Sequence, residues 1–202
     1  YWIPAFAGMT ILGCGNDGIL ITRKIMRQRI NSLKCAILFV LLCGLSACAG
    51  LPDGIEAVNG FELPRYLGKW YEIARLDHSF ERGLSKITAD YSMREDGGVK
   101  VLNRGFNMED NAWDEAEGKA YFVGDTNTGA LKVSFFGPFY GGYNIIDLDK
   151  DGYQYALVAG PNLSYLWILA RTPDLDDATL NYLLAKADAF GFAIDDLIFV
   201  EH

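Results

Sequence analysis

Apolar and polar residues alternate along most of the chain after residue 65, in short runs separated by turn signals. In "ALKVSF", Leu131, Val133 and Phe135 share one face of an extended chain, while Lys132 and Ser134 share the other. The breaks between the runs, such as "REDGG", "GDTNTG" and "GPNLS", are rich in the Gly, Asp, Asn and Pro of hairpin connections. The pattern predicts eight strands, at residues 68–76, 86–94, 98–107, 114–123, 130–136, 143–148, 153–159 and 165–171.

Eight short strands joined by tight turns favour one antiparallel sheet that closes on itself. Closure into an up-and-down barrel leaves no unpaired edge. A barrel of this size is just wide enough to be filled by side chains or to hold one small ligand. We therefore predict an all-β fold, an eight-stranded antiparallel up-and-down β-barrel whose apolar inner face is either a packed core or a pocket.

After the last of these strands, the apolar spacing becomes that of a helix. Leu180, Leu183, Leu184 and Ala187 recur at helical intervals, aspartates enrich the first turn after residue 173, and Gly191 provides a stop. This C-terminal α-helix should pack against the outside of the barrel. A short strand at residues 197–201 would end the barrel domain, which we place at residues 65–202.

A basic and then apolar segment ahead of the barrel predicts export. Five Lys and Arg residues between positions 23 and 34 precede the apolar run "CAILFVLLCG" at residues 35–44. Such a run spans only about 15 Å as a helix, roughly half of a bilayer core, so we predict a signal peptide at residues 26–47 rather than a retained membrane helix. Residues 1–25 fit no targeting pattern, and we predict a disordered upstream extension there.

The segment "LSAC", residues 45–48, resembles the lipobox that the bacterial lipoprotein signal peptidase cuts. The resemblance implies lipidation of Cys48, and by the family's rule Ala49 at the next position favours the outer membrane over the inner one. More than one acyl chain on one residue makes such an anchor stable. We expect attachment to the bacterial outer membrane through a lipidated tether at residues 48–64; an ordinary signal-peptide cysteine is the alternative.

Composition narrows the function of the exported part. All four cysteines lie at or before residue 48, so the domain beyond it has no disulfide, no thiol nucleophile and no cysteine metal ligand. Residues 48–202 contain 13 Lys and Arg against 25 Asp and Glu, and the net charge of 13 − 25 = −12 makes nucleic acid a poor partner.

Two motifs suggest metal binding or catalysis, and each has a simpler explanation. "DLDKDG", residues 147–152, matches the start of an EF-hand loop, but Val158 stands where the loop needs a glutamate, so a hairpin turn fits better. A catalytic set would have to centre on His78, beside Asp77 and Ser79, and neighbours in sequence rarely form a triad. We predict no catalytic residue, no metal site and no cofactor.

The first strand opens with "GKWYEIAR", in which Gly68 stands two residues before Trp70. With eight strands and one late helix, this resembles the G-x-W signature of the lipocalins, and "WILARTP" supplies Arg171, the arginine that this family places at the end of its last barrel strand. Trp70 would fill the narrow end of the barrel, and Gly68 would let the chain cross closely beneath it. Arg171 would stack on the indole and donate to backbone carbonyls.

Longer stretches are similar to the bacterial outer-membrane lipoprotein lipocalins, the branch related to apolipoprotein D. They are "GKWYEIARLDHSFERGL", "SFFGPFYGGYNIIDLD" and "YLWILARTP", within a resemblance that covers about residues 60–201. It implies a non-enzymatic carrier or store of hydrophobic molecules, with fatty acids such as palmitate or lysophospholipids as ligands, and a tendency to form homodimers. A carrier of haem or of a polyene-type molecule, and an enzyme built on the same barrel, are the alternatives.

The ligand would touch side chains on the inner face of the strands. A period of two along each predicted strand selects these positions, although a bulge would shift the register by one. Glu72 could orient a head group or bond a neighbouring side chain, and we favour the neighbour. The predicted ligand contacts are Glu72, Ala74, Ile87, Ala89, Tyr91, Asn103, Tyr121, Val123, Leu131, Val133, Phe135, Trp167 and Leu169.

An aromatic cluster follows the fifth predicted strand. It consists of Phe135, Phe136, Phe139, Tyr140 and Tyr143. As a patch on the rim it could dock a membrane or a second subunit, and as ordinary packing it would belong to the core and a loop. Both interpretations can hold at once.

Overall fold

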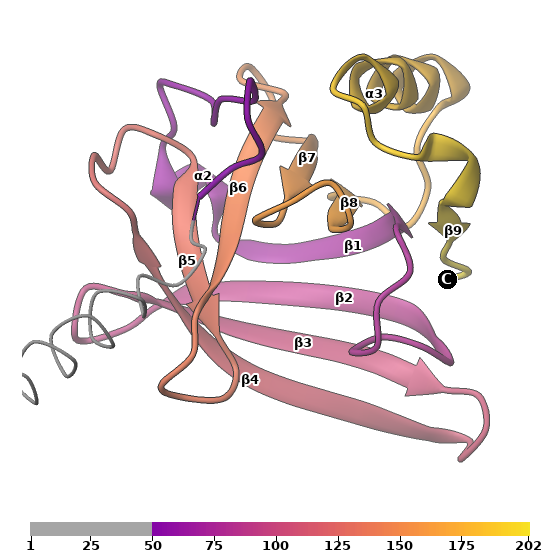
Figure 1. Ribbon diagram of the computed structural model, residues 1–202. Helices are drawn as coiled ribbons and strands as arrows, with labels where there is room; N and C mark the ends of the chain where they lie inside the picture. Colours follow the sequence, from indigo (N-terminus) through magenta and orange to yellow (C-terminus); the bar gives the residue numbers. More distant parts are fainter. Residues whose placement is uncertain (1–49) are drawn as a thin grey trace, which may run out of the picture. The chain divides into compact units, whose positions relative to one another are not determined.

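The computed structural model describes residues 50–202, in which all the predicted strands are present in the predicted order (Figure 1). The predicted upstream extension, the signal peptide and Cys48 lie outside the described residues. The elements in chain order are α2 (Leu63–Tyr66), β1 (Gly68–Arg75), β2 (Leu84–Met93), β3 (Val99–Asn107), β4 (Ala112–Phe122), β5 (Ala130–Ser134), β6 (Gly141–Leu148), β7 (Tyr155–Ala159), β8 (Leu166–Ala170), α3 (Asp177–Ala189), η1 (Ile194–Asp196) and β9 (Ile198–Phe199).

The sheet closes into a barrel because β1 pairs with a strand on each side. From β2 to β8, consecutive strands are antiparallel neighbours. β8 pairs with β1, where Tyr71 lies opposite Ala170, and β1 pairs with β2, where Trp70 lies opposite Ala89. The short β9 adds to the far end of β1. The predicted eight-stranded antiparallel barrel, followed by one helix, is confirmed.

The two faces of the barrel carry two separate apolar clusters. The inner cluster fills the barrel and includes Trp70, Tyr91 and Leu169. The outer cluster lies under α3, which runs beside the outside of the barrel and buries Leu183 and Ala187 completely (Figure 1). β7 and β8 contribute to both clusters, so their sequences, "YALVA" and "LWILA", are apolar on both faces instead of alternating.

A bulge in β1 changes the face to which its side chains point. Glu72 lies opposite Leu169 and shares the inner face with Trp70, whereas the pairing with β8 shifts before Ala74. Ala74 is fully buried in the outer cluster instead. The predicted inward position of Ala74 is therefore corrected, because one extra residue in the strand reverses the alternation.

The chain ahead of β1 is folded onto the barrel from Ile55 onward. Ile55 and Phe61 are buried, and the N–H of Val58 donates to the carbonyl oxygen of Ile145 at 2.8 Å. The N–H of Phe61 donates to the carbonyl oxygen of Asn127 at 2.9 Å. Much of the segment that we expected to be a tether is thus part of the packed domain.

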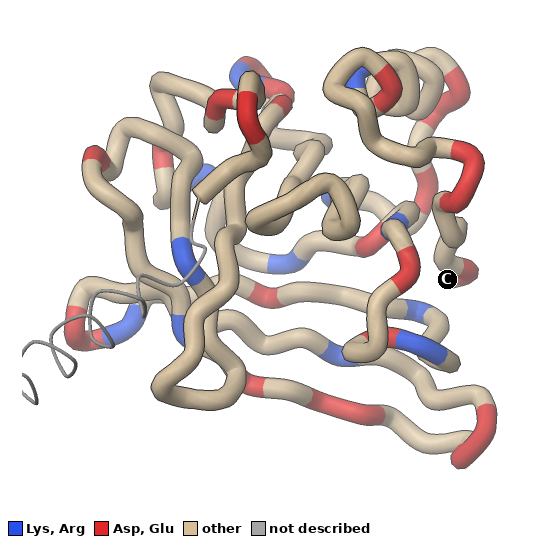
Figure 2. The backbone as a smooth tube through the Cα atoms, viewed as in Figure 1, with Lys and Arg blue, Asp and Glu red and all other residues tan. Residues whose placement is uncertain are grey.

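Acidic residues are spread along the chain, including the long β4 strand (Figure 2). On β4, Asp114, Glu115 and Glu117 are all exposed. Between residues 50 and 202, the structure contains no helix that is both long enough and apolar enough to span a bilayer.

Candidate functional site

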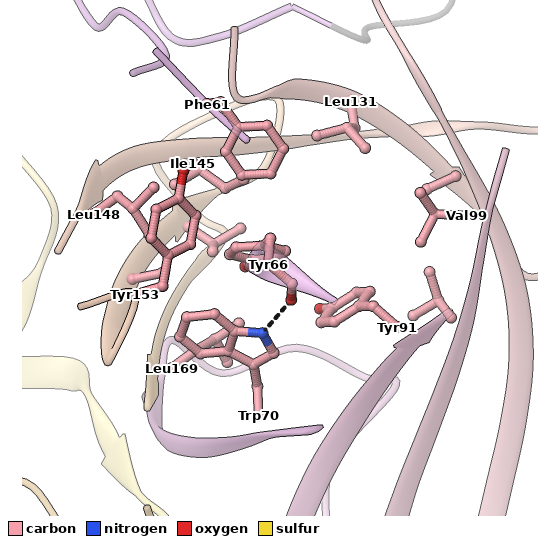
Figure 3. Packing of buried hydrophobic residues seen from close by; sticks show 14 residues of the cluster. Phe61, Tyr66, Trp70, Tyr91, Val99, Leu131, Ile145, Leu148, Tyr153 and Leu169 are labelled. Carbon is pink, nitrogen blue, oxygen red and sulfur yellow. Dashed lines mark hydrogen bonds between the residues drawn. The ribbon is translucent and has the colours of Figure 1, made fainter. Parts of the chain in front are cut away.

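One end of the barrel is closed by Trp70, the third residue of β1. Its side chain is fully buried, and its Nε1 donates a hydrogen bond of 2.8 Å to the carbonyl oxygen of Tyr66 in α2 (Figure 3). The ring of Tyr66 lies 4.6 Å from the indole, measured between centroids. Gly68 has a φ of 91°, which favours glycine, at the point where the chain turns from α2 into β1. The turn brings the indole inward as soon as the strand begins.

Arg171, directly after β8, covers the same indole. Its Cζ lies 4.0 Å from the centroid of the Trp70 ring. Its nitrogens donate to the carbonyl oxygens of Arg65 at 2.7 Å, Lys69 at 2.8 Å and Tyr153 at 3.2 Å. These carbonyls belong to α2, to β1 and to the turn between β6 and β7. One side chain therefore fastens three separate segments to the closed end of the barrel.

An apolar cavity lies inside the barrel next to this closure. It offers about 10 Å³ to a water-sized sphere, roughly what one water molecule needs. Several of the side chains that line it, including Phe61, Tyr91 and Val99, are shown in Figure 3. None of its lining residues is charged. These residues are Phe61, Leu63, Tyr66, Tyr91, Val99, Val101, Ala120, Leu131, Val133 and Tyr143.

Most of the predicted ligand contacts come together on the inner face. Glu72 lies opposite Leu169, and Asn103 lies opposite Ala89, so these polar side chains share the face of their apolar partners. Ile87 is buried beside an irregularity in the pairing of β2 with β3. The predicted contacts that belong to the inner cluster are Ala89, Tyr91, Leu131, Val133, Phe135, Trp167 and Leu169.

Two further predicted contacts, Tyr121 of β4 and Val123 directly after this strand, point outward. The inner positions of that strand include Gly118, Ala120 and Phe122, and Val123 is 43% exposed. Extending the alternation along β4 selected the wrong face of this strand, whose inner face carries the small residues Gly118 and Ala120 before Phe122. A Cβ atom at Gly118 would lie only 2.8 Å from the ring of Phe135, so this ring, from the residue directly after β5, fills the space beside Gly118.

Several interior residues were not predicted from the sequence. Val99 and Val101 share the period of Asn103 in β3, so the alternation could have selected them. Phe61 and Tyr66 precede the first strand, where no strand pattern places them inside. They enter the barrel because the segment before β1 folds across its closed end.

A buried ionic cluster of Glu72, Arg75, His78 and Glu81 forms where the β1–β2 loop, residues 76–83, folds over the inner face. Nη1 of Arg75 donates to Oε1 of Glu72 at 2.9 Å, and Nη2 donates to the carbonyl oxygen of Glu81 at 2.8 Å. Nε1 of Trp167 donates to Oε2 of Glu81 at 3.2 Å, and Nε2 of His78 lies 3.0 Å from that oxygen. Glu72 thus bonds a neighbouring side chain, as favoured from the sequence.

The two carboxyl groups of this cluster differ in their affinity for protons. Burial raises the pKa of Glu72, and the charge of Glu81 raises it further, against the opposing effect of Arg75. Burial also acts to raise the pKa of Glu81, but the hydrogen bond and charge of His78, aided by Trp167 and Arg75, bring that pKa below its ordinary value. As the pH falls, Glu72 therefore takes up a proton before Glu81 does.

Exposed apolar side chains gather on the loops at the open end of the barrel. The connections after β1, β3 and β5 meet there because successive strands are antiparallel. Phe80, Met108, Phe136 and Phe139 on these loops are all more than half exposed. The aromatic cluster noted in the sequence is thus divided, since Phe135 packs inward while Phe136 and Phe139 face solvent.

The segment that matches the start of an EF-hand loop is the turn between β6 and β7. The carboxylate of Asp149 accepts hydrogen bonds from the backbone N–H groups of Gly152 at 3.0 Å and Gln154 at 3.1 Å. Its oxygens close the turn, which is a common use of aspartate. Within residues 50–202, no group of three or more His, Cys, Asp or Glu side chains is placed to hold a metal ion.

A closed apolar barrel with this tryptophan and arginine at one end defines a lipocalin. The family model described as a lipocalin-like domain matches residues 61–202, and the chain belongs to this family. It is 53% identical over 166 residues to the outer membrane lipoprotein Blc of Vibrio cholerae serotype O1, a match that covers 81% of this chain and 97% of that protein. The outer membrane lipoprotein Blc of Citrobacter freundii is 57% identical over 174 residues, with 86% and 98% covered.

More distant proteins show the same relationship. Apolipoprotein D of Macaca fascicularis is 33% identical over 167 residues, which cover 73% of this chain and 85% of that protein. The resemblance to the bacterial outer-membrane lipocalins and to the apolipoprotein D branch is thereby confirmed. Among solved structures, insecticyanin from the tobacco hornworm Manduca sexta has a TM-score of 0.60 at 20% identity, over 76% of this chain and 87% of that one, which shows the shared fold.

Replacing Arg171 by lysine should lower the free energy of unfolding by about 1–3 kcal/mol, because one ammonium group cannot serve three carbonyls and cover the indole. Arg104→Lys is a matched control, since Cζ of Arg104 also lies over a tryptophan, 4.4 Å from the ring centroid of Trp113, but on the exposed surface. We expect a change below about 0.5 kcal/mol there. Urea denaturation measures both variants, and equal losses would contradict the assigned role of Arg171.

Glu72→Gln should become more stable relative to the wild type as the pH rises from about 4.3, the ordinary glutamate pKa, through the raised pKa of Glu72 in the folded protein. In this range the unfolded wild-type chain ionises Glu72 while the folded protein keeps the proton on it, so rising pH favours unfolding of the wild type, whereas the glutamine is neutral in both states. Urea denaturation across the pH range measures the difference. A difference that does not change with pH would contradict the direction of the shift.

Glu81→Gln should show the opposite pattern. The lowered pKa of Glu81 gives stability that is present above about pH 4.3 and lost as the pH falls through the folded-state value, so the variant's deficit should shrink in acid. At neutral pH we expect a loss of about 3 kcal/mol, because Arg75 would keep its buried charge without this carboxylate. The same titration measures it, with Glu72→Gln as the matched comparison.

Proposed function

We propose that this lipocalin is a carrier, attached by lipid to the bacterial outer membrane, that holds one hydrophobic molecule in its barrel. The observation that carries the proposal is an apolar interior with one end closed by Trp70 and Arg171 and the other bordered by apolar loops. Fatty acids and lysophospholipids are the ligands that we propose. The Blc relatives, which are named outer membrane lipoproteins, support the proposed location.

The energetics of burial support a single acyl chain as the ligand. Burying a chain of about 16 carbons is worth up to roughly 12 kcal/mol, at about 0.8 kcal/mol for each methylene group. The loss of translational freedom and of chain entropy offsets much of this gain. A dissociation constant of roughly micromolar size, equivalent to about 8 kcal/mol, is the expected balance.

The ligand would enter at the end that carries the β1–β2 and β5–β6 loops. A cavity of about 10 Å³ is too small for an acyl chain, so uptake requires inner side chains such as Phe135 and Trp167 to change rotamer. Both are only partly buried, which supports their movement. Ala116 of β4 lies opposite Asn103 and therefore on the inner face, yet it is exposed. Solvent thus reaches the inner face of β3 and β4 at these two residues.

A lipid carrier fits the interior better than the alternatives. No His, Cys or Met, which are common haem ligands, is among the residues that line the cavity. His78 lies against the ring of Trp167, at 5.1 Å between centroids, and beside the carboxylate of Glu81. This packing supports a structural role for His78 rather than a catalytic one.

Self-association is a further part of the proposal. The family resemblance implies a homodimer, and the exposed rings of Phe136 and Phe139 offer an apolar surface for a second copy. The same surface would also suit the membrane that the lipid anchor holds nearby.

Cys48→Ser should release the protein from the outer membrane into the soluble periplasmic fraction, because it removes the thioether anchor that "LSAC" predicts. Cys43→Ser is the matched control, since Cys43 lies within the apolar run of the predicted signal peptide. Fractionation and mass spectrometry of the mature N-terminus measure the outcome. Membrane attachment of the Cys48→Ser variant would contradict the proposed anchor.

Palmitic acid and a lysophospholipid should each bind the wild type saturably. Val133→Phe should weaken this binding at least about tenfold, because Val133 lines the cavity and a larger side chain takes the ligand's space. Val123→Phe is the matched control on the outward face of the same wall, and we expect unchanged affinity. Isothermal titration calorimetry measures binding, and circular dichroism checks folding; wild-type protein that binds neither lipid would contradict the proposal.

A further inference from the structure

Three tyrosine hydroxyl groups form a chain of hydrogen bonds deep in the barrel. The hydroxyl of Tyr143 in β6 lies 2.7 Å from that of Tyr66 in α2 and 2.7 Å from that of Tyr91 in β2. Tyr66 and Tyr91 are 2% and 6% exposed, and Figure 3 shows both within the packed interior near Trp70. These hydrogen bonds therefore join three segments that are far apart in the sequence.

A count of donors shows that this chain is incomplete. Each hydroxyl has one hydrogen to donate, so three hydroxyls have three, and the two bonds between them use two. Among residues 50–202 these hydroxyls make no other hydrogen bond. Whichever way the chain is oriented, one O–H is left over, and leaving a buried donor unpaired is unfavourable.

The surroundings of the spare O–H group are apolar. All three tyrosines line the cavity, and its other lining residues are Phe, Leu, Val and Ala. Burial raises the pKa of each of the three hydroxyls, which therefore keep their protons as donors. The spare O–H thus belongs to residues that line the cavity, although the cavity surface itself is apolar, and the rotamer changes that admit a ligand would also have to expose this O–H.

We propose that the Tyr66–Tyr143–Tyr91 chain is a specificity site, which takes a neutral oxygen atom carried by the inner end of the bound ligand. The inference rests on the proposed binding of a single-chain lipid in the barrel. A hydroxyl or carbonyl oxygen at the end of the acyl chain would accept the spare O–H bond. A carboxylate would be disfavoured, since no lining residue carries a positive charge to balance it. The acid group of such a ligand would remain at the end of the barrel where the ligand enters, beside the β1–β2 and β5–β6 loops.

The test compares three probes: palmitic acid, 16-hydroxypalmitic acid and 2-hydroxypalmitic acid. The wild type should bind the 16-hydroxy acid at least as tightly as palmitic acid, because the deep donor pairs with its terminal oxygen. In the triple variant Tyr66→Phe/Tyr91→Phe/Tyr143→Phe, the terminal hydroxyl of the ligand would be buried without a partner. The triple variant should therefore bind the 16-hydroxy acid about tenfold or more weakly than it binds palmitic acid. The 2-hydroxy acid should not discriminate between the proteins.

Variants with a single change sharpen the test. Tyr91→Phe leaves two hydroxyls and one bond between them, so one spare O–H remains and tolerance of the 16-hydroxy acid should persist. A role as a structural brace alone would not predict this difference between single and triple variants. Tyr182→Phe is the control, since its hydroxyl donates to Asp147 at 3.0 Å on the outside of the barrel.

The outcomes separate this inference from the proposed function. Absence of saturable palmitic acid binding to the wild type would remove the carrier function itself. Normal palmitic acid binding, with the 16-hydroxy acid rejected as strongly by the wild type as by the triple variant, would overturn only the tyrosine site. Should the triple variant not fold, carbon-13 NMR of the wild-type tyrosine Cζ atoms decides: the 16-hydroxy acid should shift the signals of these three residues beyond the change that palmitic acid causes, and equal shifts would overturn the site.

Discussion

The stacking of Arg171 on Trp70 is the contact on which the architecture of this barrel depends. It joins the end of the last barrel strand to the start of the first, and the same guanidinium binds carbonyl groups from two further segments. Those carbonyls lie where no strand neighbour is available, and backbone polar groups removed from water need partners. With this end closed, the inner apolar cluster is shielded from water on that side.

The interior differs in character from one end to the other. Near the closure it consists of aromatic and aliphatic side chains, with polarity only in the tyrosine hydroxyls and in the Trp70 ring nitrogen. At the end that carries the β1–β2 loop, the interior contains the buried ionisable side chains of Glu72, Arg75 and Glu81. Their mutual hydrogen bonds hold the β1–β2 loop against the barrel. A lipid with a polar head group and an apolar tail matches this gradient.

Much of the fold could be predicted from the sequence because strand alternation and turn composition are local properties. Strand order, barrel closure and the external helix all followed from them, while the roles expected of Trp70 and Arg171 came from the family resemblance. Ala74 was placed on the wrong face because a bulge leaves no mark in the spacing of apolar residues. Tyr121 was placed on the wrong face because two inner positions of β4, Gly118 and Ala120, carry small residues, and Phe135 fills the space beside Gly118.

The parts of the site that could not be predicted are those assembled from distant segments. Glu81 reaches Arg75 only because the β1–β2 loop folds back over the barrel, and the spacing of the charges does not reveal this. The tyrosine chain likewise unites a residue before the first strand with residues from two separate strands. The pattern of apolar and polar residues near each position gives no information about contacts between such distant segments.

The pairing of β1 with β8 also has a consequence for how the protein is made. Tyr71 and Ala170 lie opposite each other although nearly a hundred residues separate them in the sequence. Contacts between such distant positions give a topology of high contact order, and chains of this kind fold slowly. The first barrel strand must therefore stay unpaired on one side until almost the whole polypeptide is available to fold, and an unpaired strand edge is prone to aggregation.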